Sequence, residues 1–195
     1  MALYNREPCG TAIVHRAMGF LRSALAGIVT FSALTTPSGA AVGCSGSAYH
    51  QLDFFVGTWA VTDKNGKQFA TDRVSKEYGG CVVWEQWFGG HGSRGAGYSG
   101  YVPARRLWVQ TFMDNHGTVL VFEGGRTGTS FTIGGPSYPK PGHVEQNHVI
   151  FRVLPRGAVE EYWTISDDRG KTSKVIFDGF FHPIAAASPP GRETQ

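Results

Sequence analysis

Apolar and polar residues alternate along most of the chain after residue 57, and no helical spacing of any length occurs there. The run 81–88 is rich in β-branched and aromatic residues instead, which is also typical of a β-strand. The predicted strands are a short one from residue 58, then about 68–78, 81–88, 98–102, 107–114, 118–123, 129–133, 146–154, 158–165 and 174–181. About ten short strands in succession, each with one apolar face, predict an all-β fold: an up-and-down antiparallel barrel of about 8–10 strands, or a strongly rolled sheet.

Glycine, proline and asparagine mark the turns between these runs. Asn65-Gly66 is the strongest short hairpin signal in the chain. The glycine-dense segment 89–100 is followed neither by Gly-Lys-Ser/Thr nor by a helix, so we expect a loop and the start of a strand rather than a phosphate-binding loop. Segment 134–142 contains three prolines, which lack the amide hydrogen that a strand ladder needs, and is predicted to be a long loop.

Helical spacing occurs just before the first strand. Leu52, Phe55 and Val56 are spaced so that they would lie on one face of a helix. Gly57 ends this pattern, and the alternation typical of a strand begins around Trp59. We expect a short helical plug that closes one end of the barrel. Gly57 would let the backbone pass close beneath the barrel, and the indole of Trp59 would fill its base. The Gly-x-Trp sequence resembles the start of lipocalin-like (calycin) barrels.

Residues 1–43 have the composition of a targeting segment. An uncharged, largely apolar run at 23–34 follows two arginines, and the small residues at 38–41 fit a small-x-small cleavage site. This pattern predicts a secretory signal peptide over 1–43, with Met18 as a candidate true start. A membrane anchor is the alternative, although the apolar run is shorter than the roughly 20 residues that a spanning helix needs.

The rest of the chain is long enough for one domain of about 150 residues. We expect a barrel domain over 44–182 and a disordered tail over 183–195, which is rich in alanine, serine and proline. Segment 1–43 carries three arginines and one glutamate, so without it the formal net charge falls from +3 to +1. No lysine- or arginine-rich run remains, so the composition gives no indication of nucleic-acid binding.

Two cysteines follow the predicted cleavage site. Cys44 and Cys81 form an even pair, and an exported protein enters an oxidising compartment, so we expect a disulfide between them. The alternatives are two free thiols, or acylation of Cys44 at the imperfect lipobox of residues 41–44. Acylation would anchor the protein to a membrane; otherwise we expect it to be periplasmic or secreted.

Six motifs are spread over residues 44–182. They are LDFFVGTW at 52–59, GCVVWEQW at 80–87, Trp108-x-Gln110, Asp114-x-x-Gly117, Trp163-x-x-Ser166-x-Asp168-x-Gly170-x-Thr172 and Phe177-Asp178-Gly179. Together they resemble a bacterial exported family with a lipocalin-like domain of unknown function. The resemblance implies a calycin-like barrel and two cysteines near enough to pair, and it carries no settled activity. Phe112 and Ser173 stand where tryptophan is usual in that family.

Polar residues lie among aromatic ones on one face of three predicted strands. If those faces point inward, the barrel holds an aromatic-lined interior with a few oriented polar groups, as small-molecule sites do. The residues that we predict to bind a ligand are Glu85, Trp87, Trp108, Gln110, Phe112, Glu161 and Trp163. The alternative is that these side chains simply fill the barrel, because small barrels are often packed solid.

The sequence therefore predicts an exported barrel that binds a small apolar or amphipathic molecule. One alternative is a barrel enzyme with isomerase- or hydrolase-like acid–base chemistry that uses Glu85 and Glu161. Another is a scaffold that binds a protein partner at the barrel rim.

No cofactor or metal is predicted. His143 and His148 are separated by an odd number of residues, so in one strand they point to opposite faces and do not form a metal pair. Haem is ligated in the nitrobindin-type barrels that the chain distantly resembles. Here it would require His148, the one histidine predicted at the centre of a strand.

Overall fold

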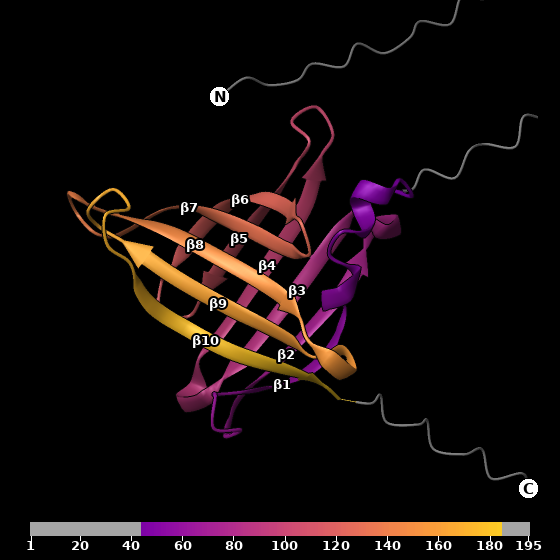
Figure 1. Cartoon of the computed structure of the whole chain (residues 1–195), viewed down its shortest axis with the longest axis horizontal. Helices are drawn as coiled ribbons and strands as arrows, with labels where there is room; N and C mark the ends of the chain where they lie inside the picture. Colours follow the sequence, from indigo (N-terminus) through magenta and orange to yellow (C-terminus); the bar gives the residue numbers. More distant parts are fainter. Residues whose placement is uncertain (1–43, 185–195) are drawn as a thin grey trace, which may run out of the picture. The chain divides into compact units, whose positions relative to one another are not determined.

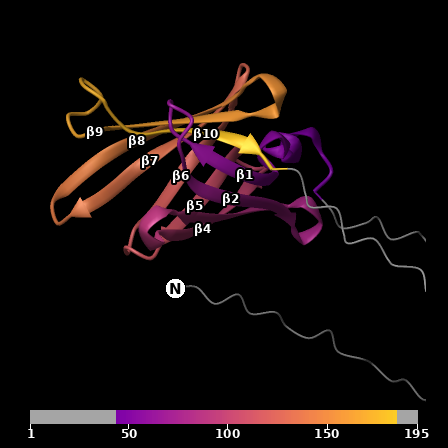
Figure 2. The same cartoon turned by 90° about the horizontal axis from the view of Figure 1, so that it is seen from below.

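The protein forms a closed β-barrel, which we describe from a computed structural model over residues 44–184 (Figures 1 and 2). Its strands are β1 (Gly57–Thr62), β2 (Gln68–Glu77), β3 (Val82–Gly89), β4 (Arg94–Val102), β5 (Leu107–Asp114), β6 (Val119–Thr127), β7 (Ser130–Lys140), β8 (His143–Val153), β9 (Val159–Ser166) and β10 (Lys174–Pro183). Five short 3₁₀ turns accompany them: η1 (Ser47–His50), η2 (Asp53–Phe55), η3 (Tyr78–Gly80), η4 (Gly90–Gly92) and η5 (Pro155–Gly157).

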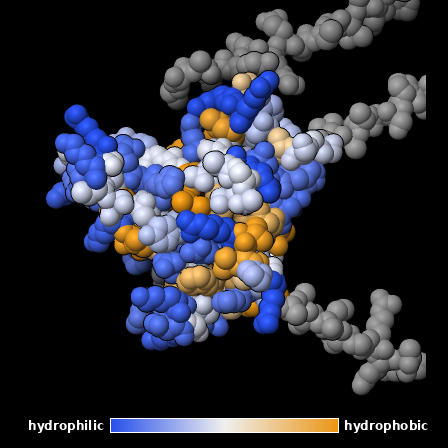
Figure 3. Space-filling view, in the orientation of Figure 1, coloured by the Kyte–Doolittle hydropathy of each residue, from blue (hydrophilic) through white to orange (hydrophobic). Residues whose placement is uncertain are grey.

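Each strand pairs antiparallel with the next one in the sequence, and β1 closes the ring by pairing with β10. The closing register runs from Trp59 opposite Pro183 to Thr62 opposite Phe180. The predicted fold class, an up-and-down antiparallel barrel with a short N-terminal plug, is confirmed. The inner face carries the buried apolar residues, whereas the outer face shown in Figure 3 has separate apolar patches among polar side chains.

The plug consists of η1 and η2 and closes the end of the barrel at which β1 begins. Leu52 and Phe55 are 4% and 3% exposed and belong to the same buried cluster as Trp59. The ring of Phe55 stacks on that of Trp59 with centroids 5.9 Å apart, and Trp59 Nε1 donates a 2.9 Å hydrogen bond to the carbonyl of Phe55. The predicted role of Trp59 at the base therefore agrees with its surroundings. Val56, by contrast, is 37% exposed.

A disulfide joins the start of the described chain to the barrel wall. Cys44 and Cys81 are bonded, with Cα atoms 4.8 Å apart, and the Cys44 amide donates to the carbonyl of Gly79. Lys76 adds a second tether, because its Nζ donates to the carbonyl of Tyr49 and to the carboxylate of Asp53. The plug is thus fixed by the disulfide to the segment between β2 and β3, and by the charge of Lys76 to the end of β2.

The expectation of a long loop at 134–142 is wrong. Strand β7 continues through Pro136 and Pro139 to Lys140, opposite β8. The ladder between β6 and β7 ends at the pair Glu123–Gly134, so from Gly135 onward β7 is paired along one edge. A strand can carry proline on an edge that has no ladder, since no amide hydrogen is required there.

Several strand boundaries also differ from expectation: β6 continues to Thr127 and β8 begins at His143. Strand β4 begins at Arg94, inside the glycine-dense segment, and β10 continues to Pro183, where we expected the tail to begin. Ile184 still donates a 2.8 Å backbone hydrogen bond to Thr58. The predicted signal peptide over 1–43, including Met18, and the tail from residue 185 lie outside the described residues. Among the described residues, no helix has the length and apolar character that crossing a bilayer requires.

Candidate functional site

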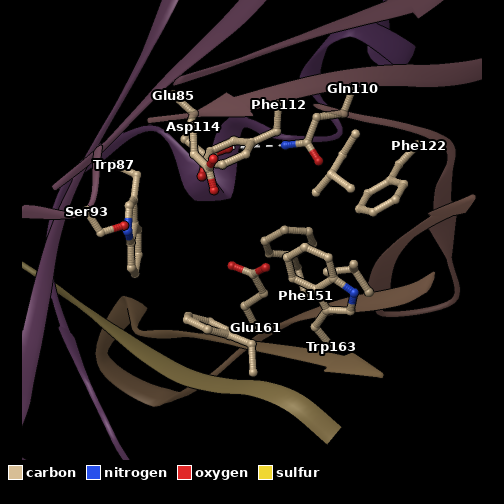
Figure 4. A pocket seen from close by; sticks show the side chains of 13 residues that line it. Glu85, Trp87, Ser93, Gln110, Phe112, Asp114, Phe122, Phe151, Glu161 and Trp163 are labelled. Atoms are coloured by element: carbon tan, nitrogen blue, oxygen red, sulfur yellow. Dashed lines mark hydrogen bonds between the residues drawn. The ribbon is translucent and has the colours of Figure 1, made fainter. Parts of the chain in front are cut away.

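The barrel encloses a cavity of about 200 Å³ (Figure 4). Asp114, the last residue of β5, and Ser93, just before β4, lie at its rim. Both occupy the end of the barrel opposite the plug, because alternate strands run in opposite directions. The lining residues are Glu85, Trp87, Ser93, Gln110, Phe112, Asp114, Leu120, Phe122, Val149, Phe151, Glu161, Trp163 and Phe177.

Six of the seven residues predicted to bind a ligand line this cavity: Glu85, Trp87, Gln110, Phe112, Glu161 and Trp163. The exception is Trp108, which is 1% exposed and packs against Tyr101 and Phe131, each at a centroid distance of 6.0 Å. It shares the inward face of β5 but lies near the plugged end, so it belongs to the floor of the barrel.

The sequence analysis did not identify the apolar residues that form the opposite wall of the cavity. Leu120, Phe122, Val149, Phe151 and Phe177 line the cavity from β6, β8 and β10. Each lies on the inward face of its strand, so the same period-of-two argument applied to those strands would have found them. Ser93 and Asp114 lie at strand ends, where alternation gives no signal.

Glu85 and Gln110 are held together across one strand. Gln110 Nε2 donates a 3.2 Å hydrogen bond to Glu85 Oε2, although β4 lies between their strands. Gly97 of β4 pairs with Glu85, and a Cβ atom there would lie 3.4 Å from Glu85 Oε2 and 3.2 Å from the ring of Phe112. The bare glycine therefore leaves room for the glutamate and the ring to lie over β4.

Glu161 approaches from the opposite wall. Figure 4 shows its carboxyl group reaching into the cavity toward Glu85 and Gln110. It comes from β9, between Phe151 of β8 and Gly179 of β10. Within the described residues its side chain accepts no hydrogen bond, so its oxygens are available to whatever occupies the cavity.

A third carboxyl group lies behind the cavity wall. Asp72 of β2 is 0% exposed, faces inward beside Trp87, and neither of its oxygens has a well-formed hydrogen bond within the described chain. Burial is the main cause that raises its pKa to about 10, and the charges of Glu85 and Glu161 contribute to this rise. The backbone amide of Arg73 lowers the pKa by less than these causes raise it. Asp72 is therefore a neutral acid at pH 7, since an ionised carboxylate without partners is costly to bury.

The two cavity glutamates are also shifted toward their neutral forms. Burial raises the pKa of Glu85 to about 7, and burial together with the charge of Glu85 raises the pKa of Glu161 well above its usual value. No lysine, arginine or histidine is among the described residues that line the cavity. Asp114 at the rim behaves differently: partial burial is outweighed by backbone hydrogen bonds from Thr118 and His116, which lower its pKa.

The aromatic walls are fixed by their own contacts. Trp163 Nε1 donates a 2.9 Å hydrogen bond to Asn147 Oδ1, and its ring meets that of Phe122 edge-on at 5.6 Å. Trp87 and Phe177 form a second edge-on pair at 5.9 Å. These geometries are favourable for aromatic pairs and keep the rings in place around the cavity.

The histidines do not contribute to the interior. His148, the residue that haem ligation would have required, is exposed on the outer face of β8, next to Gly134 of β7. Over residues 44–184, no three histidine, cysteine, aspartate or glutamate side chains converge into a group that could hold a metal ion. The chemistry of the cavity therefore comes from carboxyl groups, one amide, the Ser93 hydroxyl at the rim and aromatic rings.

No family model matches the chain, and no curated protein matches its sequence. The barrel is compatible with a lipocalin-like fold.

Proposed function

We propose that the protein binds a small apolar or amphipathic molecule inside the barrel, as a lipocalin-like carrier or receptor. The observation that carries this proposal is the hollow interior, where aromatic rings surround a few converging polar groups. Apolar concave sites with sparse polar groups are the usual form of small-molecule sites. A barrel that served only as a packed scaffold would fill the space between Trp87 and Trp163 with side chains.

Tryptophan emission tests the proposal. Trp87 and Trp163 line the cavity, so an apolar probe that enters it should quench or shift their fluorescence with a saturable dependence on concentration. Native mass spectrometry of protein purified from its own source would then identify a retained ligand by mass. If no probe gives a saturable change, the cavity does not bind small molecules, and the rim becomes the candidate site for a protein partner.

A second candidate function is acid–base catalysis. It is favoured by the pair Glu85 and Glu161, because a carboxyl group with a pKa of about 7 can both donate and accept protons at neutral pH. Glu85→Gln distinguishes the two functions. An enzyme would lose roughly 10²–10⁴ in turnover and keep its binding. A binder would lose about tenfold in affinity, since the amide still offers an oxygen but no charge.

We also propose export, in keeping with the disulfide between Cys44 and Cys81. The mature chain would then begin between about residues 41 and 44. Intact mass before and after reduction tests this start and the bridge together. A diacylglycerol mass on Cys44 would instead indicate a lipoprotein, and a chain that begins at residue 1 or 18 would contradict export.

A further inference from the structure

The cavity holds acidic groups without basic partners. Glu85 and Glu161 face it from opposite walls, and Asp72 lies behind it, fully buried with both oxygens unpartnered. Glu161 accepts no hydrogen bond in the described structure, and Glu85 receives one neutral amide from Gln110. A buried carboxyl group that is ionised is ordinarily paired with a cation, and without one burial raises its pKa. The described residues supply no such cation here.

The walls add a second feature that favours positive charge. Trp87, Trp163, Phe112, Phe122 and Phe177 surround the carboxyl groups. The face of an aromatic ring carries partial negative charge and attracts cations, most strongly for tryptophan, and the effect grows when water is excluded. Cages of aromatic rings are the usual recognition site for organic ammonium groups.

We infer that the ligand is a small organic cation, a protonated amine attached to an apolar group, whose ammonium lies between Glu85 and Glu161. This inference rests on the proposed function and names the chemical class of its ligand. The ammonium would supply the charge and the hydrogen-bond donors that the glutamates lack, and the apolar group would contact the rings of Trp87 and Trp163.

Other ligand charges fit less well. An anionic ligand would enter a cavity lined by carboxyl groups and lose its hydration without gaining a cation. A neutral alcohol can donate to Glu85 or Glu161, but it gains neither the charge-assisted hydrogen bond nor the attraction of the rings. A bare metal ion is disfavoured because the described carboxyl groups do not converge closely enough to hold one.

Three probes with the same phenyl group and different head groups test the inference by titration calorimetry at pH 8: 2-phenylethylamine, 2-phenylethanol and 3-phenylpropionate. We expect the amine to bind at least about tenfold more tightly than the alcohol, and the propionate more weakly than both. Glu161→Gln should remove at least about tenfold of the preference for the amine. Glu160→Gln is the matched control, since Glu160 pairs with Arg152 on the outer face of the same strand and should leave the preference unchanged.

Each outcome separates the inference from the proposed function. If the alcohol or the propionate binds as tightly as the amine, small-molecule binding stands and the cationic class is wrong. If none of the three probes binds, the proposed function fails together with the inference. Should Glu161→Gln not fold, as judged by its thermal transition, Glu85→Gln replaces it with the same expected loss of preference, and an unchanged preference in that variant overturns the inference.

Discussion

Glu85 and Gln110 are hydrogen-bonded at 3.2 Å although a whole strand separates them. The contact exists because Gly97 presents no side chain on the inner face of the intervening β4. The next inward residue toward the rim, Gly95, is also a glycine, and a Cβ there would lie 2.4 Å from the ring of Phe112. The shape of this cavity wall is therefore set by two glycines as much as by the residues that line it.

Gly97→Ala should reduce the affinity for a cavity probe by about tenfold or more. The added methyl group would lie 3.0 Å from the carbonyl oxygen of Thr111 and 3.2 Å from the ring of Phe112. Both distances are shorter than ordinary contacts, so the ring or the backbone of β5 must move by a few tenths of an ångström and change the cavity wall. Gly100→Ala is the control, because no atom lies within 4 Å of the Cβ position there. Probe titrations of both variants decide the matter. Equal affinities would show that the β4 wall does not shape the site.

The free energy of unfolding should fall as the pH rises from 5 to 7. The pKa values of Asp72 and Glu85 are about 10 and about 7 in the folded protein, above their values in the unfolded chain. The contribution of these two carboxyl groups to stability is complete below their pKa values in the unfolded chain, near 4. It is lost as the pH rises toward their pKa values in the folded protein. The slope is limited to about 1.4 kcal/mol per pH unit for each proton. Urea unfolding at several pH values measures it.

Asp72→Asn should flatten that dependence. The asparagine cannot ionise in the unfolded chain, so the slope between pH 5 and 7 should decrease by up to about 1.4 kcal/mol per pH unit. The slope is compared rather than the absolute stability, because burying the asparagine amide by itself lowers the free energy of unfolding at every pH. An unchanged slope would mean that Asp72 is not held neutral by its surroundings.

Trp59→Ala should cost about 3–5 kcal/mol of unfolding free energy, the range for a large buried aromatic residue. The indole is 3% exposed, packs against Phe55 and Phe181, and donates a hydrogen bond inside the base. Tyr138→Ala, at a side chain that is 70% exposed, should cost less than about 1 kcal/mol. Denaturant midpoints compare the two. A loss below about 1 kcal/mol at Trp59 would remove its role in closing the barrel.

Removing the disulfide should cost about 4 kcal/mol in the chain-entropy account, because Cys44 and Cys81 are 37 residues apart. A variant with Cys44→Ser and Cys81→Ser, compared with the oxidised protein in urea, gives this value. Reduction of the wild-type protein should produce the same loss. A cost near zero would show that the plug is held by Lys76 and its packing alone.

Much of the barrel could be predicted because alternation is a local signal. Strand β5 was predicted from Leu107 to Asp114, as it is found, and the inward face of β3 put Glu85 with Trp87. The prolines of β7 led to the wrong prediction of a loop. A proline is excluded from a strand only where its amide would have to pair, and the sequence does not show that β6 no longer pairs with β7 there.

The depth of a residue along the barrel was the other quantity that alternation could not supply. Trp108 and Phe112 share one face of β5, yet one lies in the plugged floor and the other lines the cavity. Asp72 was missed for a related reason: an aspartate in a strand suggests an exposed position, and its burial becomes evident when Trp59 and Trp87 are seen on either side of it.

The most direct test of the account is a crystal structure of the protein with the tightest-binding of the three phenyl probes. We predict electron density for the probe inside the barrel, with its ring against Trp87 or Trp163 and its head group about 3 Å from Glu85 or Glu161. Density for the probe confined to the outer surface, with Trp87, Phe112 and Phe177 closed over the interior, would contradict the account.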